Sequence, residues 1–250
     1  MEQPSAFHPA SPILDFCPPS LPARWYTDPD HYARELREIH AKSWIYVGRA
    51  NDLPALTLRR VEIAGQNLLL IKDEKGEIRC LHNTCRHRGS ELCKNSEQKL
   101  KAKLITCPYH EWSYDLAGRL VRVPHVPETP GFDKSAHGLF TAHVKLWNGF
   151  IFVWLGKRKA KPIAECFAFD NAGLAKLEPE HMKEVGRERY RIASNWKVLL
   201  ENYLECYHCH GSHPELCVTM DVEATYKNTD EDWKGEYFAG PVQLYPGKVT

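Results

Sequence analysis

Residues 85–112 read CRHRGSELCKNSEQKLKAKLITCPYHEW, and this stretch decides the fold. Each end of it pairs one thiol with one imidazole, Cys85 with His87 and Cys107 with His110. Two short loops at the tips of neighbouring hairpins would bring these two sulfurs and two nitrogens together. The pattern therefore predicts a single inorganic centre held between two loops.

Two kinds of centre suit this donor set. Zinc would take all four ligands tetrahedrally, whereas a Rieske [2Fe–2S] cluster would take both cysteines on one iron and both histidines on the other. The spacing favours the cluster, because zinc sites usually pair Cys with Cys and His with His, and here each half mixes the two. Buried cysteines with hydrogen-bonded histidines are the plainer alternative, and they account less well for four such residues in this order.

Short strand-like runs surround this motif. Regularly spaced short strands with turn signals between them predict a small antiparallel sandwich or barrel. The expected strands are 44–47, 56–63, 67–72, 78–81, 103–106, 120–123, 150–155 and, further on, 187–193. A helix is expected near 29–42, because Asp28 can cap it and Pro29 suits its first position. The basic stretch 156–162, GKRKAKP, is interpreted as a domain boundary.

A second motif, NWKVLLENYLECYHCHGSHP, occupies residues 195–214. We expect a helix over 195–208 that begins at a cap formed by Ser194 or Asn195. Its buried face would contain Val198, Leu199, Tyr203 and Cys206. On one side of such a helix Asn202, Glu205 and His208 would project together, because they are spaced three residues apart.

His208 and His213 are candidate metal ligands, although on an unbroken helix they would diverge. They could converge if the helix ends at Gly211, which tolerates a left-handed cap. With one carboxylate from elsewhere they would form the 2-His-1-carboxylate triad of oxygen-activating Fe(II) enzymes. Residues 206–210 also match the C-x-x-C-H haem-attachment pattern, which leaves Glu205 and His213 unused. A Cys-x-x-Cys redox pair and solvated histidines at a polar helix end are further alternatives.

The composition excludes other classes of function. The 250 residues carry 33 Lys and Arg against 32 Asp and Glu, so the net charge of +1 argues against a nucleic-acid partner. Residues 1–22 hold six prolines and no continuous apolar run, so we expect no signal peptide, and no run is long enough for a membrane span. Nine cysteines cannot all pair, which favours a reducing cytoplasm. We expect Cys80 and Cys93 to be core residues.

Together the two motifs resemble one family. CRHRG followed by CPYHEW is similar to the Rieske motif of the large (alpha) subunits of Rieske non-haem iron oxygenases of the aromatic ring-hydroxylating type. That family commonly has Gly or Ala at the position where this chain has Glu111. The segment 195–214 resembles their mononuclear-iron segment, and the resemblance begins near Trp25. It implies an α+β fold. The implied parts are an N-terminal arm and helix (1–43) that packs with the catalytic domain, an antiparallel all-β Rieske domain (44–160), and the incomplete start of an α+β helix-grip catalytic domain (161–250).

The resemblance also implies the site residues. The [2Fe–2S] cluster would be held by Cys85, His87, Cys107 and His110, the mononuclear Fe(II) by His208 and His213, and catalytic roles would fall to Glu205 and Asn202. In the family an acidic residue at the position of Glu205 joins the cluster of one subunit to the iron of its neighbour, which implies a homotrimer. Only 37 residues follow His213, and none matches the family's third, carboxylate ligand. We therefore expect a C-terminally truncated chain.

The implied activity is hydroxylation of a small organic substrate with O2. Electrons from NAD(P)H would arrive through a reductase or ferredoxin, and the reaction would be aromatic ring dihydroxylation or monooxygenation with demethylation. The ECYHC context of Glu205 favours the branch that acts on carnitine, glycine betaine and related quaternary ammonium compounds. Two alternatives remain, namely a [2Fe–2S] electron-transfer protein or inactive fragment that lacks a working mononuclear site, and a structural zinc module.

Overall fold

The structure is a computed structural model that describes residues 20–124, 130–157, 160–166, 176–204, 208–222 and 245. The chain divides into two compact units, one of residues 33–186 and the other of residues 1–32 together with 187–250. Within the described ranges, no helix is long and apolar enough to cross a membrane. The domain boundaries expected after residues 43 and 160 stay predictions.

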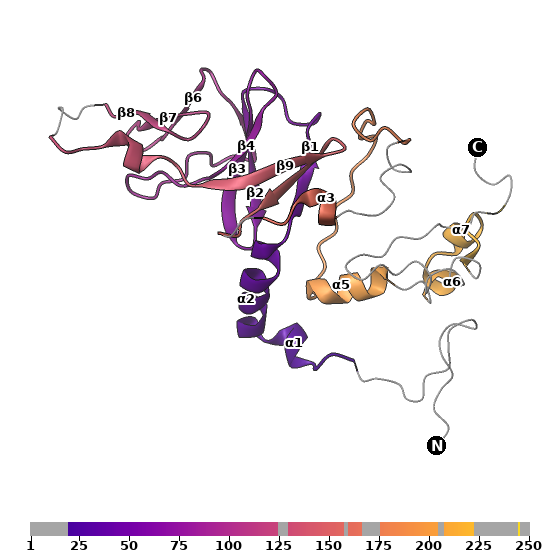
Figure 1. The fold of residues 1–250 in the computed structure, drawn as a ribbon. Helices are drawn as coiled ribbons and strands as arrows, with labels where there is room; N and C mark the ends of the chain where they lie inside the picture. The colour runs from indigo at the N-terminus through magenta and orange to yellow at the C-terminus, as the bar shows by residue number, and fades with distance from the viewer. Residues whose placement is uncertain are drawn as a thin grey trace. The chain divides into compact units, whose positions relative to one another are not determined.

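Residues 33–186 form two β-sheets. The strands described in this unit are β1 (Ile45–Arg49), β2 (Thr57–Ile63), β3 (Gln66–Lys72), β4 (Ile78–His82), β5 (Glu97–Lys99), β6 (Leu104–Thr106), β7 (Ser113–Asp115), β8 (Leu120–Arg122), β9 (Thr141–Trp147) and β10 (Phe150–Trp154). The larger sheet has the order β1-β10-β9-β4-β3-β2-β5 and the smaller one the order β6-β7-β8. Figure 1 shows β6, β7 and β8 next to one another. Every neighbouring pair is antiparallel, which confirms the predicted antiparallel β-rich domain.

Strand β3 lies inside the larger sheet and is buried on both faces. Successive side chains of a strand point to opposite faces, so Leu69 and Ile71 pack into one hydrophobic cluster, and Leu68 and Leu70 into another. All four side chains are fully buried. The cluster on the side of Leu69 also contains both predicted thiol ligands, so the core and the candidate centre are built from the same residues.

The strands predicted between residues 44 and 155 agree with the structure to within two residues at each end. Three strands were not predicted, namely β5, β7 and β9. β5 and β7 are only three residues long, and in β9 no side chain is fully buried. β9 pairs with β10 from His143 to Trp147 and with β4 at Thr141 and Ala142. The pairing with β10 is a local hairpin closed by Asn148 and Gly149, both with left-handed backbone, and this Asn-Gly signal was missed. Only the pairing with β4 joins distant parts of the chain.

The described helices are short. They are α1 (Arg24–Thr27), α2 (Pro29–Glu38), α3 (Ile163–Cys166), α5 (Trp196–Tyr203), α6 (Cys209–Ser212) and α7 (Pro214–Cys217), with the 3-10 turns η1 (His40–Lys42) and η2 (Lys134–His137). The carboxylate of Asp28 accepts a hydrogen bond from the Asp30 amide at 2.9 Å, as predicted for a cap. The helix begins at Pro29 as expected but ends at Glu38, and the predicted last turn is the separate 3-10 turn η1.

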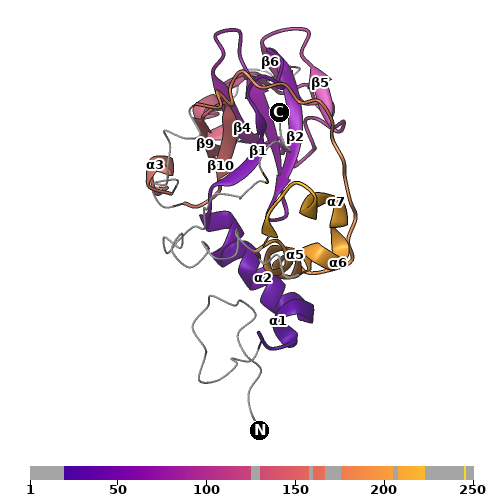
Figure 2. The same ribbon diagram turned by 90° about the vertical axis from the view of Figure 1, so that its right-hand side faces the viewer.

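Several expectations for residues 187–222 are wrong. Residues 187–193 form no strand and are exposed, because none of the described residues supplies a strand to pair with them. The helix expected over 195–208 begins correctly, with Asn195 accepting from the Lys197 amide at 3.1 Å, but α5 ends at Tyr203. His208 instead precedes α6, which α7 follows with a single residue between them (Figure 2).

The apolar face predicted for this helix is not buried. Val198 and Leu199 keep 43% and 47% of their surface exposed, and Tyr203 keeps 84%. Cys206, the fourth residue of the predicted face, lies outside the described residues. Within the described part of residues 1–32 and 187–250, no segment buries the side of α5 that carries Val198, Leu199 and Tyr203.

Candidate metal centres

Cys107 and His110 lie in the loop that joins β6 to β7, and this loop is the tip of a hairpin because Thr106 pairs with Ser113. Cys85 and His87 lie instead in the long connection from β4 to β5. The expectation of two hairpin tips is therefore wrong for the first loop, because β4 pairs with β3 and β9, whereas β5 pairs with β2.

Both loops nevertheless make the same turn. In the first, the amide of Gly89 donates to the carbonyl of Cys85 at 3.0 Å, and in the second the amide of Glu111 donates to the carbonyl of Cys107 at 3.0 Å. The donor residue is left-handed in both loops, with φ of 72° at Gly89 and 57° at Glu111. A helical turn closed by a left-handed residue is a common way to end a helix, and here it places the histidine of each loop beside its cysteine.

Glu111→Gly is expected to raise the free energy of unfolding by roughly 0.5–1 kcal/mol. A left-handed backbone costs an ordinary residue about 1–2 kcal/mol, and glycine avoids this cost. Part of the stabilisation is lost again, because glycine has more conformational freedom in the unfolded chain and loses more of it on folding. Denaturant unfolding of both proteins measures the change. Gly89→Ala is the matched control at the equivalent position, where a Cβ meets no atom within 4 Å and only the backbone strain remains, so this variant should lose stability. A Glu111→Gly protein less stable than its parent would contradict the argument.

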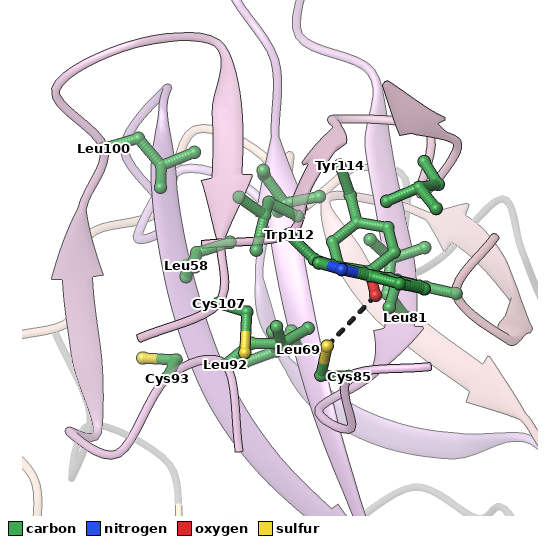
Figure 3. Packing of buried hydrophobic residues seen from close by; sticks show 14 residues of the cluster. Leu58, Leu69, Leu81, Cys85, Leu92, Cys93, Leu100, Cys107, Trp112 and Tyr114 are labelled. Atoms are coloured by element: carbon green, nitrogen blue, oxygen red, sulfur yellow. Dashed lines mark hydrogen bonds between the residues drawn. The ribbon is translucent and has the colours of Figure 1, made fainter. Parts of the chain in front are cut away.

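The two thiols are buried in one hydrophobic cluster (Figure 3). Cys85 is 2% exposed and Cys107 is 1% exposed. The hydroxyl of Tyr114 accepts a hydrogen bond from the Arg86 amide at 3.1 Å, so its own proton is free to point at the Cys85 sulfur, also 3.1 Å away. Burial raises the pKa of the Cys85 thiol, and the bond from Tyr114 opposes that rise.

The two imidazoles lie together at the exposed side of the same loops. The ring centroids of His87 and His110 are 4.7 Å apart, and their planes are inclined by 63°. Partial burial lowers the pKa of His87, and the nearby charges of His110 and Arg88 lower it further. This favours the neutral imidazole, which is the form that binds a metal. A cavity of about 870 Å³ opens beside the pair, lined also by Arg86 and Trp112.

This arrangement fits a two-iron cluster. Within the described residues, no three His, Cys, Asp or Glu side chains converge on one point, as four ligands of a tetrahedral zinc would. In a Rieske cluster each iron takes only two protein ligands, and the loops present two sulfurs in a dry core and two nitrogens at its edge. Cys80 and Cys93 are buried free thiols, as expected for core residues, and burial raises the pKa of Cys80 to about 12.

Asn83, which no sequence motif indicated, anchors the first loop. It is completely buried, and its side-chain oxygen accepts from the amides of Leu92 at 3.0 Å and Cys93 at 2.9 Å. Its side-chain nitrogen donates to the carbonyl of Cys93 at 2.8 Å and to the Asn67 side chain at 3.1 Å. The only signal in the sequence is a polar residue directly after a buried strand.

Asn83→Ala is expected to lower the free energy of unfolding by at least about 3 kcal/mol. The substitution leaves two buried amides and a carbonyl without partners, and each such group costs about 1–3 kcal/mol. Denaturant unfolding measures the loss. Asn67→Ala removes one bond to Asn83 and one to the part-buried Glu91 side chain, and it leaves the bonds of Asn83 to Leu92 and Cys93 intact. It is the control, with a smaller expected loss. Equal losses in the two variants would show that the four bonds of Asn83 do not carry the stability of the loop.

The second candidate centre brings two histidines together. The ring centroids of His208 and His213 are 5.3 Å apart at an interplanar angle of 75°. His208 precedes α6 and His213 follows it, so one short helical turn separates them. The prediction placed the end of the turn at Gly211, but the turn ends at Ser212. Pro214 disfavours helical backbone at the residue before it, and His213 has φ of −133° and ψ of 58°, outside the helical region, before Pro214 begins α7.

The other residues predicted for this centre are less well defined. Asn202 lies exposed on α5, and no described contact joins it to either histidine. Glu205 lies outside the described residues. Within the described part of the chain, no Asp, Glu, Cys or further His completes a three-ligand site with His208 and His213. The structure thus brings two imidazoles close together, and a facial triad takes two imidazoles among its three ligands.

Two family models match the chain in the order of these centres. One is the Rieske [2Fe-2S] domain, which matches residues 43–133. The other is the ring hydroxylating alpha subunit (catalytic domain), which matches residues 179–241. The first match contains all four cluster residues, and the second contains the two histidines and Glu205.

Similar curated proteins are oxygenase subunits. The glycine betaine monooxygenase oxygenase subunit of Chromohalobacter salexigens is 38% identical over 213 residues, which are 85% of this chain and 46% of that protein. The carnitine monooxygenase oxygenase subunit of Escherichia coli is 31% identical over 226 residues, 89% of this chain and 60% of that protein. The chain thus spans about half the length of the curated relatives it matches.

Solved structures of the same kind share the fold. The quaternary ammonium Rieske monooxygenase CntA, in complex with an inhibitor, matches with a TM-score of 0.74 and 29% identity, over 81% of this chain and 57% of that one. Naphthalene 1,2-dioxygenase from Rhodococcus sp., bound to indole, matches with a TM-score of 0.65 and 26% identity, over 76% and 46%. The expected mixture of a β-rich cluster domain and part of a catalytic domain is therefore confirmed.

Proposed function

The chain belongs to the Rieske non-haem iron oxygenase alpha subunits, and from this premise we propose that the full-length protein is a monooxygenase that hydroxylates a quaternary ammonium compound. The observation that carries the proposal is the pair of matching loops, which present two buried sulfurs and two adjacent imidazoles. The match of residues 179–241 to a catalytic domain argues against a pure electron-transfer protein or a structural zinc module.

We assign the cluster to Cys85, His87, Cys107 and His110, and two ligands of the mononuclear iron to His208 and His213. When bound, the cluster supplies single electrons at a potential raised by its neutral imidazoles, and a ferrous ion with open positions supplies oxygen activation. The resemblance assigns the link between the two centres to Glu205, and a catalytic role to Asn202.

The side chains around the first centre have separate tasks. The core keeps water from the two sulfurs. The Tyr114 hydroxyl lies 3.1 Å from the Cys85 sulfur, and it would donate to that sulfur in its thiolate form and so stabilise the thiolate. His87 and His110 lie at the exposed edge, where a partner protein or a neighbouring subunit can approach within electron-transfer reach. These features support a centre that exchanges electrons with partners through its histidine side.

The substrate class rests on the relatives. They include glycine betaine and carnitine monooxygenase subunits, and the similar solved structures include a quaternary ammonium monooxygenase. The naphthalene dioxygenase matches with a lower TM-score and lower identity. Both observations favour monooxygenation of a quaternary ammonium compound over dihydroxylation of an aromatic ring.

We propose a homotrimer that receives electrons from an NAD(P)H-dependent reductase or ferredoxin and works in the cytoplasm. One of the similar solved structures, that of a quaternary ammonium Rieske monooxygenase, gives insight into inter-subunit electron transfer in that protein, which supports an assembly of several copies. Among the described cysteines, Cys80, Cys85, Cys93, Cys107 and Cys217 are free thiols, which supports a reducing compartment. Sedimentation of the full-length protein tests the trimer, and a monomer would contradict it.

The decisive experiment uses the full-length protein with a reductase and NAD(P)H. We expect about three irons and two acid-labile sulfides per chain, from one cluster and one mononuclear site. Oxygen uptake and hydroxylated product should appear with glycine betaine or carnitine and be absent with aromatic acids such as benzoate. Zinc without sulfide would overturn the cluster assignment, and turnover of the aromatic acids alone would overturn the substrate class.

A further inference from the structure

The two histidines of the first centre are held in different ways. The ring of His87 stacks on the indole of Trp112, with centroids 4.6 Å apart and planes inclined by only 9°. His110 stacks on Tyr109, with centroids 3.7 Å apart at 30°. Both pairs of rings are stacked, and the Tyr109–His110 distance is the shorter of the two. The proximity of the rings therefore does not distinguish the two histidines, and the difference lies in how firmly each supporting ring is itself held.

Trp112 is a fixed support. Only 7% of its surface is exposed, and it belongs to the hydrophobic cluster that contains both thiols. Its ring is braced at the edge by Phe132, at 5.9 Å and 72°, and by His137, at 5.8 Å and 78°. Tyr109, in contrast, is 61% exposed, and its only ring contact in the described part of the chain is with His110.

Trp112 also connects the two loops. Its carbonyl accepts the amide of Cys107 at 2.8 Å, which closes the second loop, while its side chain lies flat against the histidine of the first loop. A flat ring against an imidazole leaves that imidazole free to slide but opposes rotation out of the plane. Because the support comes from the other loop, it holds the two loops in one relative position.

We propose that Trp112 is a positioning residue for His87, and that it holds the imidazole plane in the orientation that the cluster needs before the cluster is assembled. The proposal rests on the assignment of His87 as a ligand. It predicts that the two histidines respond differently to loss of their stacking partners, the first strongly and the second weakly.

The first test uses the protein without its cluster, as the full-length chain purified and stripped with a chelator. The indole ring current should shift the ring-proton NMR signals of His87 upfield, and His87→Gln identifies those signals. Trp112→Leu should return them to the position of a free imidazole, whereas Trp112→Phe should keep part of the shift. Signals of His87 that do not move in Trp112→Leu would overturn the proposal.

The second test uses the loaded full-length protein and does not depend on turnover. Trp112→Leu should broaden the electron paramagnetic resonance signal of the reduced cluster. It should also speed the loss of the cluster to a chelator by roughly two- to tenfold, because this is the rate factor that corresponds to the energy of one aromatic stack. Trp112→Phe should restore both properties most of the way. Tyr109→Leu, which removes the partner of the other histidine, should change them by less than about twofold.

A control separates positioning from general loss of stability. Leu100→Ala removes a buried side chain from the same hydrophobic cluster and leaves the stack intact, so it should lower the thermal midpoint and keep the resonance line shape. Equal line broadening in Leu100→Ala, or no rescue by Trp112→Phe, would overturn the proposal. A wild-type protein without sulfide would instead refute the proposed function, and the ring-current test would still decide the position of His87.

Discussion

Replacing His87 with alanine in the full-length protein is expected to abolish the visible absorption of the [2Fe–2S] cluster and its acid-labile sulfide. Each iron of a Rieske cluster takes two protein ligands, so loss of one imidazole leaves the nitrogen-bound iron with only His110. The exposed position of the pair at the loop tips lets water and chelators reach that iron. Absorption spectra and sulfide assays on the purified variant measure the loss.

His143→Ala is the matched control for this prediction. His143 lies on β9, in a different part of the same unit, and its ring makes no described contact with either cluster loop. The control should keep the full sulfide content and the wild-type spectrum. A His87→Ala protein that kept its sulfide would show that His87 is not a ligand of the cluster, and a different second nitrogen or oxygen donor would then have to be sought.

Replacing His208 with alanine is expected to remove turnover and spare the cluster. The structure presents only two imidazoles at the second centre, 5.3 Å apart, and the loss of one leaves too few ligands to hold the iron. Activity should fall by more than about a hundredfold, because even ligand-supporting residues typically contribute about 10–100-fold. The iron content should fall by about one per chain, while sulfide and visible absorption stay at wild-type values.

His210→Ala is the control at this centre, because His210 is exposed on α6 between the two candidate ligands. It should retain both its iron and its activity. If His208→Ala also lost the cluster, the division into two separate centres would be wrong. If His210→Ala lost iron and His208→Ala did not, the ligand pair would have to be reassigned within the same turn.

Local sequence alone was enough to predict the chemistry of both centres. The alternation of thiol and imidazole at Cys85, His87, Cys107 and His110 distinguishes a two-iron cluster from a zinc site, because ligand type and spacing belong to the local chain. Seven strands were predictable for the same reason, since alternation and turn residues are local signals. The sequence shows that β3 is an apolar run. It does not show that both faces of β3 are buried, which depends on the two hydrophobic clusters that pack against them.

Other features depend on contacts between distant parts of the chain. The start of β9 pairs with β4, which lies far away in the sequence, and the first loop is no hairpin because β4 and β5 pair with other strands. The helix expected to carry His208 ends early, and the two histidines meet across the turn of α6. Helical spacing predicted that His208 and His213 converge, but at the end of one long helix that stops at Gly211. In the structure they lie on either side of the separate turn α6.

The sequence indicated the candidate ligands, and the packing of the folded chain decided which side chains hold them in place. Asn83 anchors the first loop through bonds to Leu92 and Cys93, and Trp112 reaches from the second loop to stack on His87. Neither role has a local pattern, because a hydrogen bond or a stacked ring depends on which loops the folded sheets bring together. Ligand identity follows from side-chain chemistry, whereas ligand orientation follows from packing across the fold.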